Sequence, residues 1–229
     1  MNIKNLSFKF DQSSSDFFKN LTITFEPNTV HVIQGDNGVG KSTLFSILQG
    51  VTQKNAILDA TIELDRVIYT ADNNALPHAF THQVHTVLQK YDSMLANQFS
   101  FVQNLQLANM ARYPGLQGLP EATLLNFVTA LQIHPDIPVH LLSGGQRQLL
   151  AICMALQKST KLLLLDEPTA TLDKKNAHHV MRCLYQLAQE LKVTMVVICH
   201  DKELVAEYAQ GNSFIMEQSE DGLRVLRVV

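Results

Sequence analysis

The chain of 229 residues is poor in several sequence features, and each shortage excludes a class of protein. It has no apolar run of the roughly 20 residues that a membrane-spanning helix needs. Its N-terminus lacks the basic start and long apolar segment of a signal peptide. Its net charge is −3 and it has no long basic run, so it shows no electrostatic footprint for nucleic acid. We therefore expect a cytoplasmic chain that does not bind nucleic acid.

Cysteine is scarce too, because the chain has only 3 of these residues: Cys153, Cys183 and Cys199. Their number is odd, their spacing matches no metal site, and each lies within a helical or strand pattern. We therefore expect buried, reduced thiols rather than disulfides. Hydrophobic residues make up 46% of the chain, enough to bury a full α/β core, so we expect a single domain over residues 1–229.

Glycine is sparse, yet it gathers in residues 35–43, which read Gly-Asp-Asn-Gly-Val-Gly-Lys-Ser-Thr. This run fits the G-x-x-x-x-G-K-[ST] phosphate loop. The apolar residues 30–33 predict a buried parallel strand before it, and apolar spacing in 43–48 predicts a helix after it. Backbone amides would then cradle phosphates, Lys41 would bring charge to the β- and γ-phosphates, and Ser42 would offer a hydroxyl to Mg²⁺. The alternative is a glycine-rich turn before an ordinary helix. The expected nucleotide-binding residues are Gly35, Asp36, Asn37, Gly38, Val39, Gly40, Lys41, Ser42 and Thr43.

A second apolar run, residues 162–165, is followed directly by Asp166 and Glu167. In open α/β sheets, ligands bind beyond the carboxyl ends of the strands. Asp166 is therefore placed to hold Mg²⁺ through water, and Glu167 to orient or deprotonate an attacking water. The plainer interpretation is that both are solvated acids at the end of a core strand.

Four motifs together resemble those of the ATP-binding cassette (ABC) ATPases. They are GDNGVGKST at 35–43, LSGGQRQ at 142–148, LLLLDEPTATLD at 162–173 and VVICHD at 196–201. The resemblance covers essentially the whole chain. It implies an α/β fold with a P-loop NTPase core, a mainly parallel sheet, a small antiparallel β-subdomain and an inserted helical lobe that carries the signature motif.

The resemblance also implies roles for residues outside the phosphate loop. Ser143, Gly144, Gly145 and Gln146 would open a helix that points at the γ-phosphate held by a second subunit, a use that suits a helix N-terminus. Asp173 matches the aspartate of the loop at the subunit interface, although Thr-Ala-Thr-Leu precedes it here. His200 matches the switch histidine that contacts the γ-phosphate; its position after an apolar strand, rather than its residue type, distinguishes it.

An aromatic near the N-terminus would stack on adenine in this family. Residues 6–10 alternate as a strand does, and Phe10 is the best match. Its ring offers a flat apolar face without base-specific hydrogen bonds. Phe8 is the rival, and a plain core role for Phe10 is the other alternative.

Two departures from the family pattern stand out. Residues 67–74 occupy the place where the family has a glutamine that helps hold Mg²⁺, and they contain none. Asp72 is the closest replacement by position, and we expect its carboxylate to take the metal role; Gln83 is the nearest downstream glutamine. Residues 52–66 are also short, so we expect a trimmed antiparallel subdomain.

The remaining pattern divides the chain into a core and a lobe. We expect residues 1–75 and 155–229 to form the nucleotide-binding core, and about 76–154 to form the helical lobe ending in the signature. Within the lobe, 84–88 and 124–131 have helical apolar spacing, and a proline and glycine cluster at 114–120 predicts a loop. In the core, 177–191 predicts a helix, and 214–217 with 223–226 predict a hairpin.

The family resemblance implies a subunit that binds and hydrolyses ATP with Mg²⁺ and closes as a homodimer. Its partner would be a transmembrane permease on a separate chain, so the protein would lie peripherally on the inner face of the cell membrane. One alternative is a soluble ABC ATPase acting on the ribosome or DNA, although such proteins usually carry two cassettes, long linkers or basic patches. Another is a nucleotide-gated binding module with little turnover.

Overall fold

The computed structural model describes residues 1–112, 134–156, 159–209 and 212–229. Within them, a six-stranded sheet has the order β10-β9-β3-β8-β7-β6. Its strands β3, β6, β7, β8 and β9 pair in parallel, and β10 pairs antiparallel to β9. Their bounds are β3 Val30–Gln34, β6 Val84–Val87, β7 Leu162–Asp166, β8 Thr194–Ile198, β9 Ser213–Gln218 and β10 Arg224–Val228.

A four-stranded antiparallel sheet has the order β2-β1-β4-β5. Its strands are β1 Asn2–Lys9, β2 Phe18–Thr24, β4 Ile57–Leu64 and β5 Val67–Thr70. Residues 52–66, which are short for the family, still supply β4. The expected combination of a mainly parallel sheet with an antiparallel subdomain is therefore confirmed.

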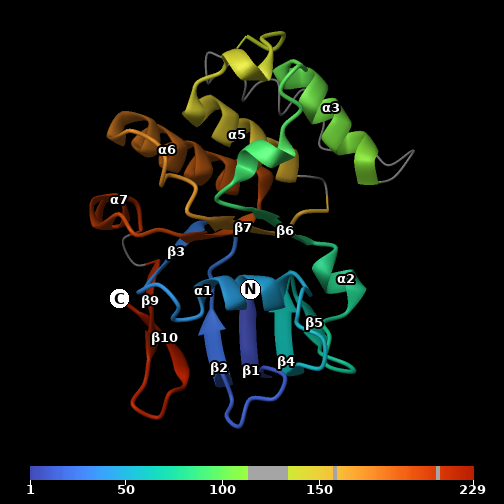
Figure 1. Cartoon of the computed structure of the whole chain (residues 1–229), viewed down its shortest axis with the longest axis vertical. Helices are drawn as coiled ribbons and strands as arrows, with labels where there is room; N and C mark the ends of the chain where they lie inside the picture. Colours follow the sequence, from blue (N-terminus) through green and yellow to red (C-terminus); the bar gives the residue numbers. More distant parts are fainter. Residues whose placement is uncertain (113–133, 157–158, 210–211) are drawn as a thin grey trace.

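Helices cover both faces of the six-stranded sheet (Figure 1). Helix α1 lies between the two sheets, and α5 and α6 pack on the opposite face of the larger one. The helices are α1 Lys41–Leu48, α2 His78–Thr81, α3 Phe101–Arg112, α5 Gly144–Ala155, α6 Lys174–Leu191 and α7 Lys202–Tyr208, with short 3₁₀ turns η1 Tyr91–Met94 and η2 Val139–Leu141.

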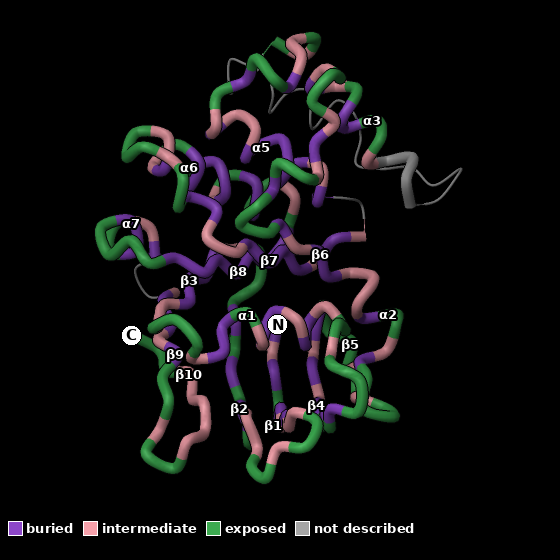
Figure 2. Tube along the Cα trace, in the orientation of Figure 1, coloured by how far each residue is buried: buried purple, intermediate pink, exposed green. Residues whose placement is uncertain are grey.

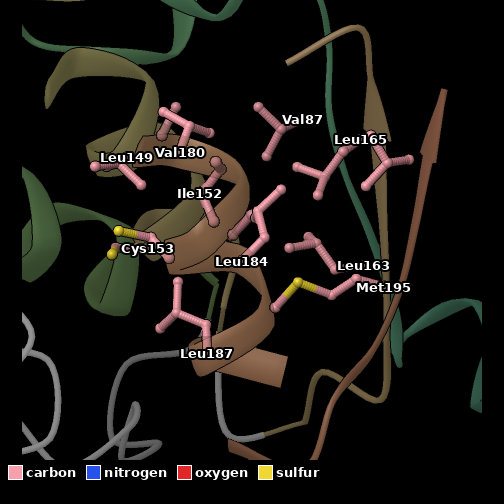
Figure 3. Packing of buried hydrophobic residues seen from close by; sticks show 14 of the residues in the cluster. Val87, Leu149, Ile152, Cys153, Leu163, Leu165, Val180, Leu184, Leu187 and Met195 are labelled. Carbon is pink, nitrogen blue, oxygen red and sulfur yellow. The ribbon is translucent and has the colours of Figure 1, made fainter. Parts of the chain in front are cut away.

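Alternation along the central strands explains this layering. Leu163 and Leu165 of β7 enter the cluster formed with α5 and α6, whereas Leu162 and Leu164 enter the cluster formed with α1. Figure 3 shows the first cluster, in which Leu184 of α6 lies against the sheet. The central strands are buried on both faces (Figure 2), as parallel strands covered by helices must be. The core is thus two apolar layers that share one sheet.

The structure corrects one expected element. Residues 84–88 were predicted as helix, but 84–87 form β6, which pairs with β7 from Val84↔Leu162 to Val87↔Leu165. A four-residue apolar run fits either element by pattern, and here pairing with a neighbouring strand decided it. These residues therefore lie in the core sheet and not among the helices of the lobe.

The other predicted elements are either confirmed by the structure or not tested by it. The helix at 177–191 and the hairpin at 214–226 are confirmed by α6 and by the pairing of β9 with β10, and the three cysteines are buried and free. The predicted helix at 124–131 and loop at 114–120 lie outside the described residues. The division into core and lobe otherwise stays a prediction. In the described ranges, no helix combines the length and apolarity needed to cross a bilayer.

Candidate functional site

The phosphate loop connects the carboxyl end of β3 to the start of α1, as the sequence predicted. Gly35 and Gly40 have φ angles of 143° and 112°, which residues with a side chain rarely adopt. A Cβ on Gly35 would lie 2.3 Å from the Met216 carbonyl oxygen, and one on Gly40 would lie 2.7 Å from the Phe17 ring. No side chain caps α1 at Gly40. The amides of its first turn are therefore directed at an open anion site.

Lys41 supplies positive charge inside this loop. Its Nζ donates hydrogen bonds to the carbonyl oxygens of Gly35, at 2.7 Å, and Asp36, at 2.8 Å. Burial lowers the pKa of Lys41, and the carboxylates of Glu167 and Asp166 act in the opposite direction. The fold thus holds an ammonium group at the loop with two acids nearby.

A cavity of about 160 Å³ brings the loop and these acids together. Burial raises the pKa of Asp166, and the neighbouring Glu167 raises it further, while Lys41 and His200 lower it. Both the phosphate loop and the end of β7 contribute to the walls, which are formed by Asn37, Gly38, Gly40, Lys41, Ser42, Thr43, Asp166, Glu167 and Ile198. The cavity therefore joins the two motifs that the sequence suggested would meet.

The site has the chemistry that Mg²⁺ requires. Mg²⁺ is commonly bound by one or two protein oxygens together with phosphate oxygens and waters, rather than by a full protein cage. Ser42 and Asp166 line one cavity, and the unfavourable burial of the Asp166 charge is what a divalent cation would relieve. In the part of the chain that the structure describes, no cluster of three or more acidic, histidine or cysteine ligands occurs.

Glu167 is held by residues from two other strand ends. Its φ is 50°, a left-handed conformation that costs energy for a residue with a side chain. Its Oε1 lies 3.1 Å from Nε2 of His200, which follows β8. Its Oε2 accepts a hydrogen bond from Nε2 of Gln89 at 3.2 Å. The strained backbone and the two contacts fix the carboxylate at the edge of the phosphate cavity.

Gln89 contacts Glu167 at the site, and the sequence interpretation missed it. It comes two residues after β6, so it lies at the same carboxyl edge of the sheet as Glu167 and His200. The signal was present, because a short apolar run followed by glutamine has the form of the family's strand and loop. Interpreting 84–88 as a helix concealed it.

The structure does not bring Asp72 or Gln83 into this group. Asp72 follows the edge strand β5 and forms a tight bridge with Ala75, in which each amide donates to the other's carbonyl at 2.9 and 3.0 Å. The amide of Gln83 donates to the hydroxyl of Tyr69 and to a helix carbonyl. Of these three residues, only Gln89 contacts the carboxylate of Glu167, so the structure does not support the expected metal role of Asp72.

A second cavity, of about 370 Å³, adjoins the first along α1. Phe8 is buried, whereas Phe10 is half-buried at its wall, with the two ring centroids 4.9 Å apart. Its walls are formed by Phe8, Phe10, Ser42, Thr43, Ser46, Ile47, Val51, Thr52 and Gln53. This placement favours Phe10 over Phe8 as the adenine platform.

Phe17 and Arg224 complete the aromatic side of the site, and neither was anticipated. The Phe17 ring lies edge-on to Phe10 at 4.9 Å between centroids. The guanidinium of Arg224 lies 4.5 Å from the centroid of Phe17, in cation–π contact. These residues pack the start of β2 and of β10 against Gly40 of the phosphate loop.

The signature residues begin helix α5. The Ser143 side chain accepts a hydrogen bond from the amide of Gln146, and the Gln146 side chain accepts one from the amide of Ser143, which forms a capping box. Asp173 caps α6 in a similar way by accepting from the amide and side chain of Asn176, and these bonds lower its pKa. Neither motif lines the two cavities described above.

Comparison with known proteins agrees with this geometry. A family model described as ABC transporter matches residues 18–170. A tyrosine transport ATP-binding protein of Clostridioides difficile is 32% identical over 227 residues, which cover 94% of this chain and 87% of that protein. An energy-coupling factor transporter ATP-binding protein of Clostridium perfringens is 27% identical over 95% of this chain and 74% of its own.

Solved structures show the same fold. The cbiO1 protein of Clostridium perfringens, part of the ABC transporter complex cbiONQ, superposes with a TM-score of 0.75 at 26% identity, over 98% of this chain and 86% of that one. A dimeric ATP-binding cassette bound to ADP and Pi gives a TM-score of 0.68 at 23% identity, over 100% of this chain and 97% of its own, and it supports the fold alone.

The fold and the site are thus those of a P-loop ATPase with a cassette signature. The chain belongs to the ABC transporter family.

Proposed function

We propose that this chain is the ATP-hydrolysing subunit of an ABC transporter, and that ATP-driven closure of a dimer powers a permease on a separate chain. The catalytic part of this proposal depends on the position of the Glu167 carboxylate. It lies at the cavity that Lys41 and Asp166 share, between His200 and Gln89. An ATP-binding module without turnover would not need this arrangement.

In this proposal each residue acts on a defined part of Mg²⁺-ATP. The loop amides and Lys41 hold the phosphates, and Phe10 stacks on adenine. Ser42, Asp166 through water, and the side-chain oxygen of Gln89 would hold Mg²⁺, which neutralises phosphate charge when bound.

The hydrolytic step requires a water placed against the γ-phosphorus. Its oxygen attacks phosphorus while a proton moves to the carboxylate of Glu167, and the bond to the β-phosphate oxygen breaks. His200 contacts the Glu167 carboxylate and holds it in position. In this proposal it would also contact the γ-phosphate. The strained backbone of Glu167 supports this role, since strain of this kind clusters at functional sites.

The site of one chain would be completed by a second copy. Helix geometry leaves the amides of Gly144 and Gly145 without an intrahelical acceptor. The capping box occupies only the neighbouring amides of Ser143 and Gln146. The first turn of α5 can therefore bind an anion, and in the dimer that anion is the γ-phosphate on the other chain. Asp173, at the start of α6, would lie in the same interface.

The transport role rests on the relatives, whose names describe ATP-binding subunits for tyrosine transport, methionine import and energy-coupling factor transporters. By analogy, the chain would sit on the cytoplasmic face of the membrane against its permease. The names describe several unlike cargoes, so they fix the role of the subunit and leave the cargo open.

Glu167→Gln tests the catalytic proposal. We expect ATP binding to persist while turnover falls at least about a hundredfold, because a general base contributes that much. The variant should also remain dimeric in ATP, which gel filtration measures. Lys41→Ala is the matched control, and it should weaken ATP binding itself. Wild-type turnover in Glu167→Gln would remove this residue from its role.

The same variant tests the transport role. Tagged Glu167→Gln, purified with ATP from solubilised membranes of the native host, should retain a membrane protein with several spans in stoichiometric amount. The reading frame of this membrane protein should neighbour that of this chain. Recovery of ribosomes or DNA in its place would favour the soluble alternative.

A further inference from the structure

The segment after Gln89 contacts the signature helix of the same chain. The first residue of η1 is Tyr91, only 5% exposed, and its ring packs in the cluster formed by α5, α6 and the sheet. Its hydroxyl donates a hydrogen bond to the carbonyl oxygen of Gly144 at 3.1 Å. Gly144 is the first residue of α5 and directly follows the cap residue Ser143. Tyr91 is therefore bonded to the turn that would face the partner's nucleotide.

Tyr91 also reaches the loop that leads to Asp173. The Thr171 side chain, two residues before Asp173 caps α6, lies near enough to the Tyr91 hydroxyl to lower its pKa. The Tyr91 hydroxyl thus bonds to one segment of the proposed dimer interface and lies beside a second. Burial raises the pKa of Tyr91, and the neighbouring Asp92 raises it further, so the hydroxyl stays protonated and able to donate.

A weaker contact runs beside this bond. Asp92 lies 3.7 Å from Nε of Arg147 on α5, with 61% and 33% of the two side chains exposed. That Nε is buried and makes no hydrogen bond with any residue that the structure describes. A pair this exposed and this long contributes little on its own. The directional link between η1 and α5 is therefore the hydroxyl of Tyr91.

The other end of the segment touches the catalytic carboxylate. Gln89 donates to Glu167 at 3.2 Å, and only Lys90 separates Gln89 from Tyr91. A continuous path therefore runs from Glu167 through Gln89 and the backbone to Tyr91, and then to Gly144. In a dimer it would begin at one nucleotide and end at the helix that serves the other.

We propose that Tyr91 is a positioning residue that couples the two ATP sites of the dimer, by tying the first turn of α5 to the loop of Gln89. A displacement of Gln89 away from Glu167 would then be carried by Tyr91 to Gly144, and it would change the position of Ser143 relative to the partner's γ-phosphate. This inference rests on the proposed function, since it has no meaning in a chain that acts as a monomer.

Tyr91→Phe tests the role, because it keeps the buried ring and removes only the hydroxyl. In the full chain we expect the ATP affinity of the monomer to stay within about twofold of wild type. The Hill coefficient for ATP should fall towards 1, and the turnover number should fall on the order of tenfold, the scale of a typical coupling between sites. The melting temperature is measured alongside, to separate positioning from folding.

Tyr69→Phe is the matched control. It also removes a tyrosine hydroxyl that makes a hydrogen bond, in this case one accepted from Gln83 at 2.8 Å, but Tyr69 lies on β5 of the antiparallel sheet. We expect its Hill coefficient and turnover to equal those of wild type. An equal loss of cooperativity in both variants would overturn the specific role of Tyr91.

A double-mutant cycle with Gln89→Ala tests the path itself. If Gln89 and Tyr91 act through one path, their effects on cooperativity should be less than additive. Additive effects, or a Tyr91→Phe enzyme with wild-type cooperativity, would show that Tyr91 only fills the core. If the wild-type protein neither dimerises nor responds cooperatively to ATP, the proposed function fails as well, so the two failures are distinguishable.

Discussion

At the end of β7, two neighbouring carboxylates have different surroundings and therefore different tasks. Asp166 is half-buried, and both its burial and its neighbour raise its pKa, so its charge is unfavourable until a cation arrives. Glu167 has a left-handed backbone conformation, and its carboxylate contacts Gln89 and His200. In the proposed mechanism, Asp166 would hold the metal and Glu167 would accept a proton.

The raised pKa of Asp166 predicts an effect on stability. A folded-state pKa above the unfolded one means that the charged form is disfavoured by folding, so this residue's contribution to stability improves as the pH falls. Asp166→Asn should therefore raise the melting temperature of the nucleotide-free protein at pH 7. Scanning calorimetry checks this, and the advantage should shrink as the pH falls through the pKa of Asp166.

The same variant should lose the stabilisation that Mg²⁺-ATP gives to wild type, because it lacks a metal ligand. Asp136→Asn is the control, since Asp136 is 81% exposed and outside the site. A lower melting temperature for Asp166→Asn at pH 7 would show that the carboxylate is already compensated in the free protein.

At the scale of elements, the first turn of α5 contains two glycines, and its backbone amides are available to bind an anion. A Cβ on Gly145 would lie 3.4 Å from Asn176 at the start of α6, and one on Gly144 would lie 3.4 Å from Leu172. Ser143 fixes the turn through its capping box. Two helix N-termini are thus packed together at one surface, where the helix dipoles favour an anion.

Ser143→Arg should abolish hydrolysis by the dimer while leaving ATP affinity of the monomer unchanged. The bulky side chain would occupy the place of the partner's phosphate, and losing the cap should also cost about 1 kcal/mol. Ser100→Arg is a matched control, because Ser100 forms the same reciprocal bonds with Gln103 at the start of α3. Equal losses of activity would show that destabilisation, and not the signature, explains the result.

At the scale of the whole molecule, the two halves of the proposed active site occupy different places. The phosphate cavity lies at the carboxyl edge of the six-stranded sheet, where β3, β7 and β8 end. The signature lies at the start of α5, on the helical side of that sheet (Figure 1). The lining of the cavity includes no signature residue, and in the proposed dimer a second copy would join the halves.

This division predicts how activity depends on concentration. ATP hydrolysis should rise more steeply than in proportion to protein concentration until the dimer is saturated, because each turnover needs two chains. Phosphate release, measured across a dilution series at saturating Mg²⁺-ATP, checks it. A rate that stays proportional to concentration down to the lowest dilution would show that a single chain is competent and would refute the shared site.

The phosphate loop, the acids after β7 and the family were predictable from the sequence, because each is a local pattern with its own chemistry. Lys41 follows glycines at the spacing of a phosphate loop, and Asp166 and Glu167 follow an apolar strand. These residues carry their signal within a few positions of the chain. Their meeting in one cavity followed from the rule that parallel strands end at a common edge.

Tertiary structure alone decided the rest. Residues 84–87 became a strand because β7 offered them hydrogen bonds, and this placed Gln89, in preference to Asp72, beside Glu167. The bond from Tyr91 to Gly144 joins residues 53 positions apart, and nothing near either residue announces it. A short apolar run can form a helix or a strand, and pairing with a neighbouring strand decides between them. Contacts between distant segments leave no periodic pattern in the sequence.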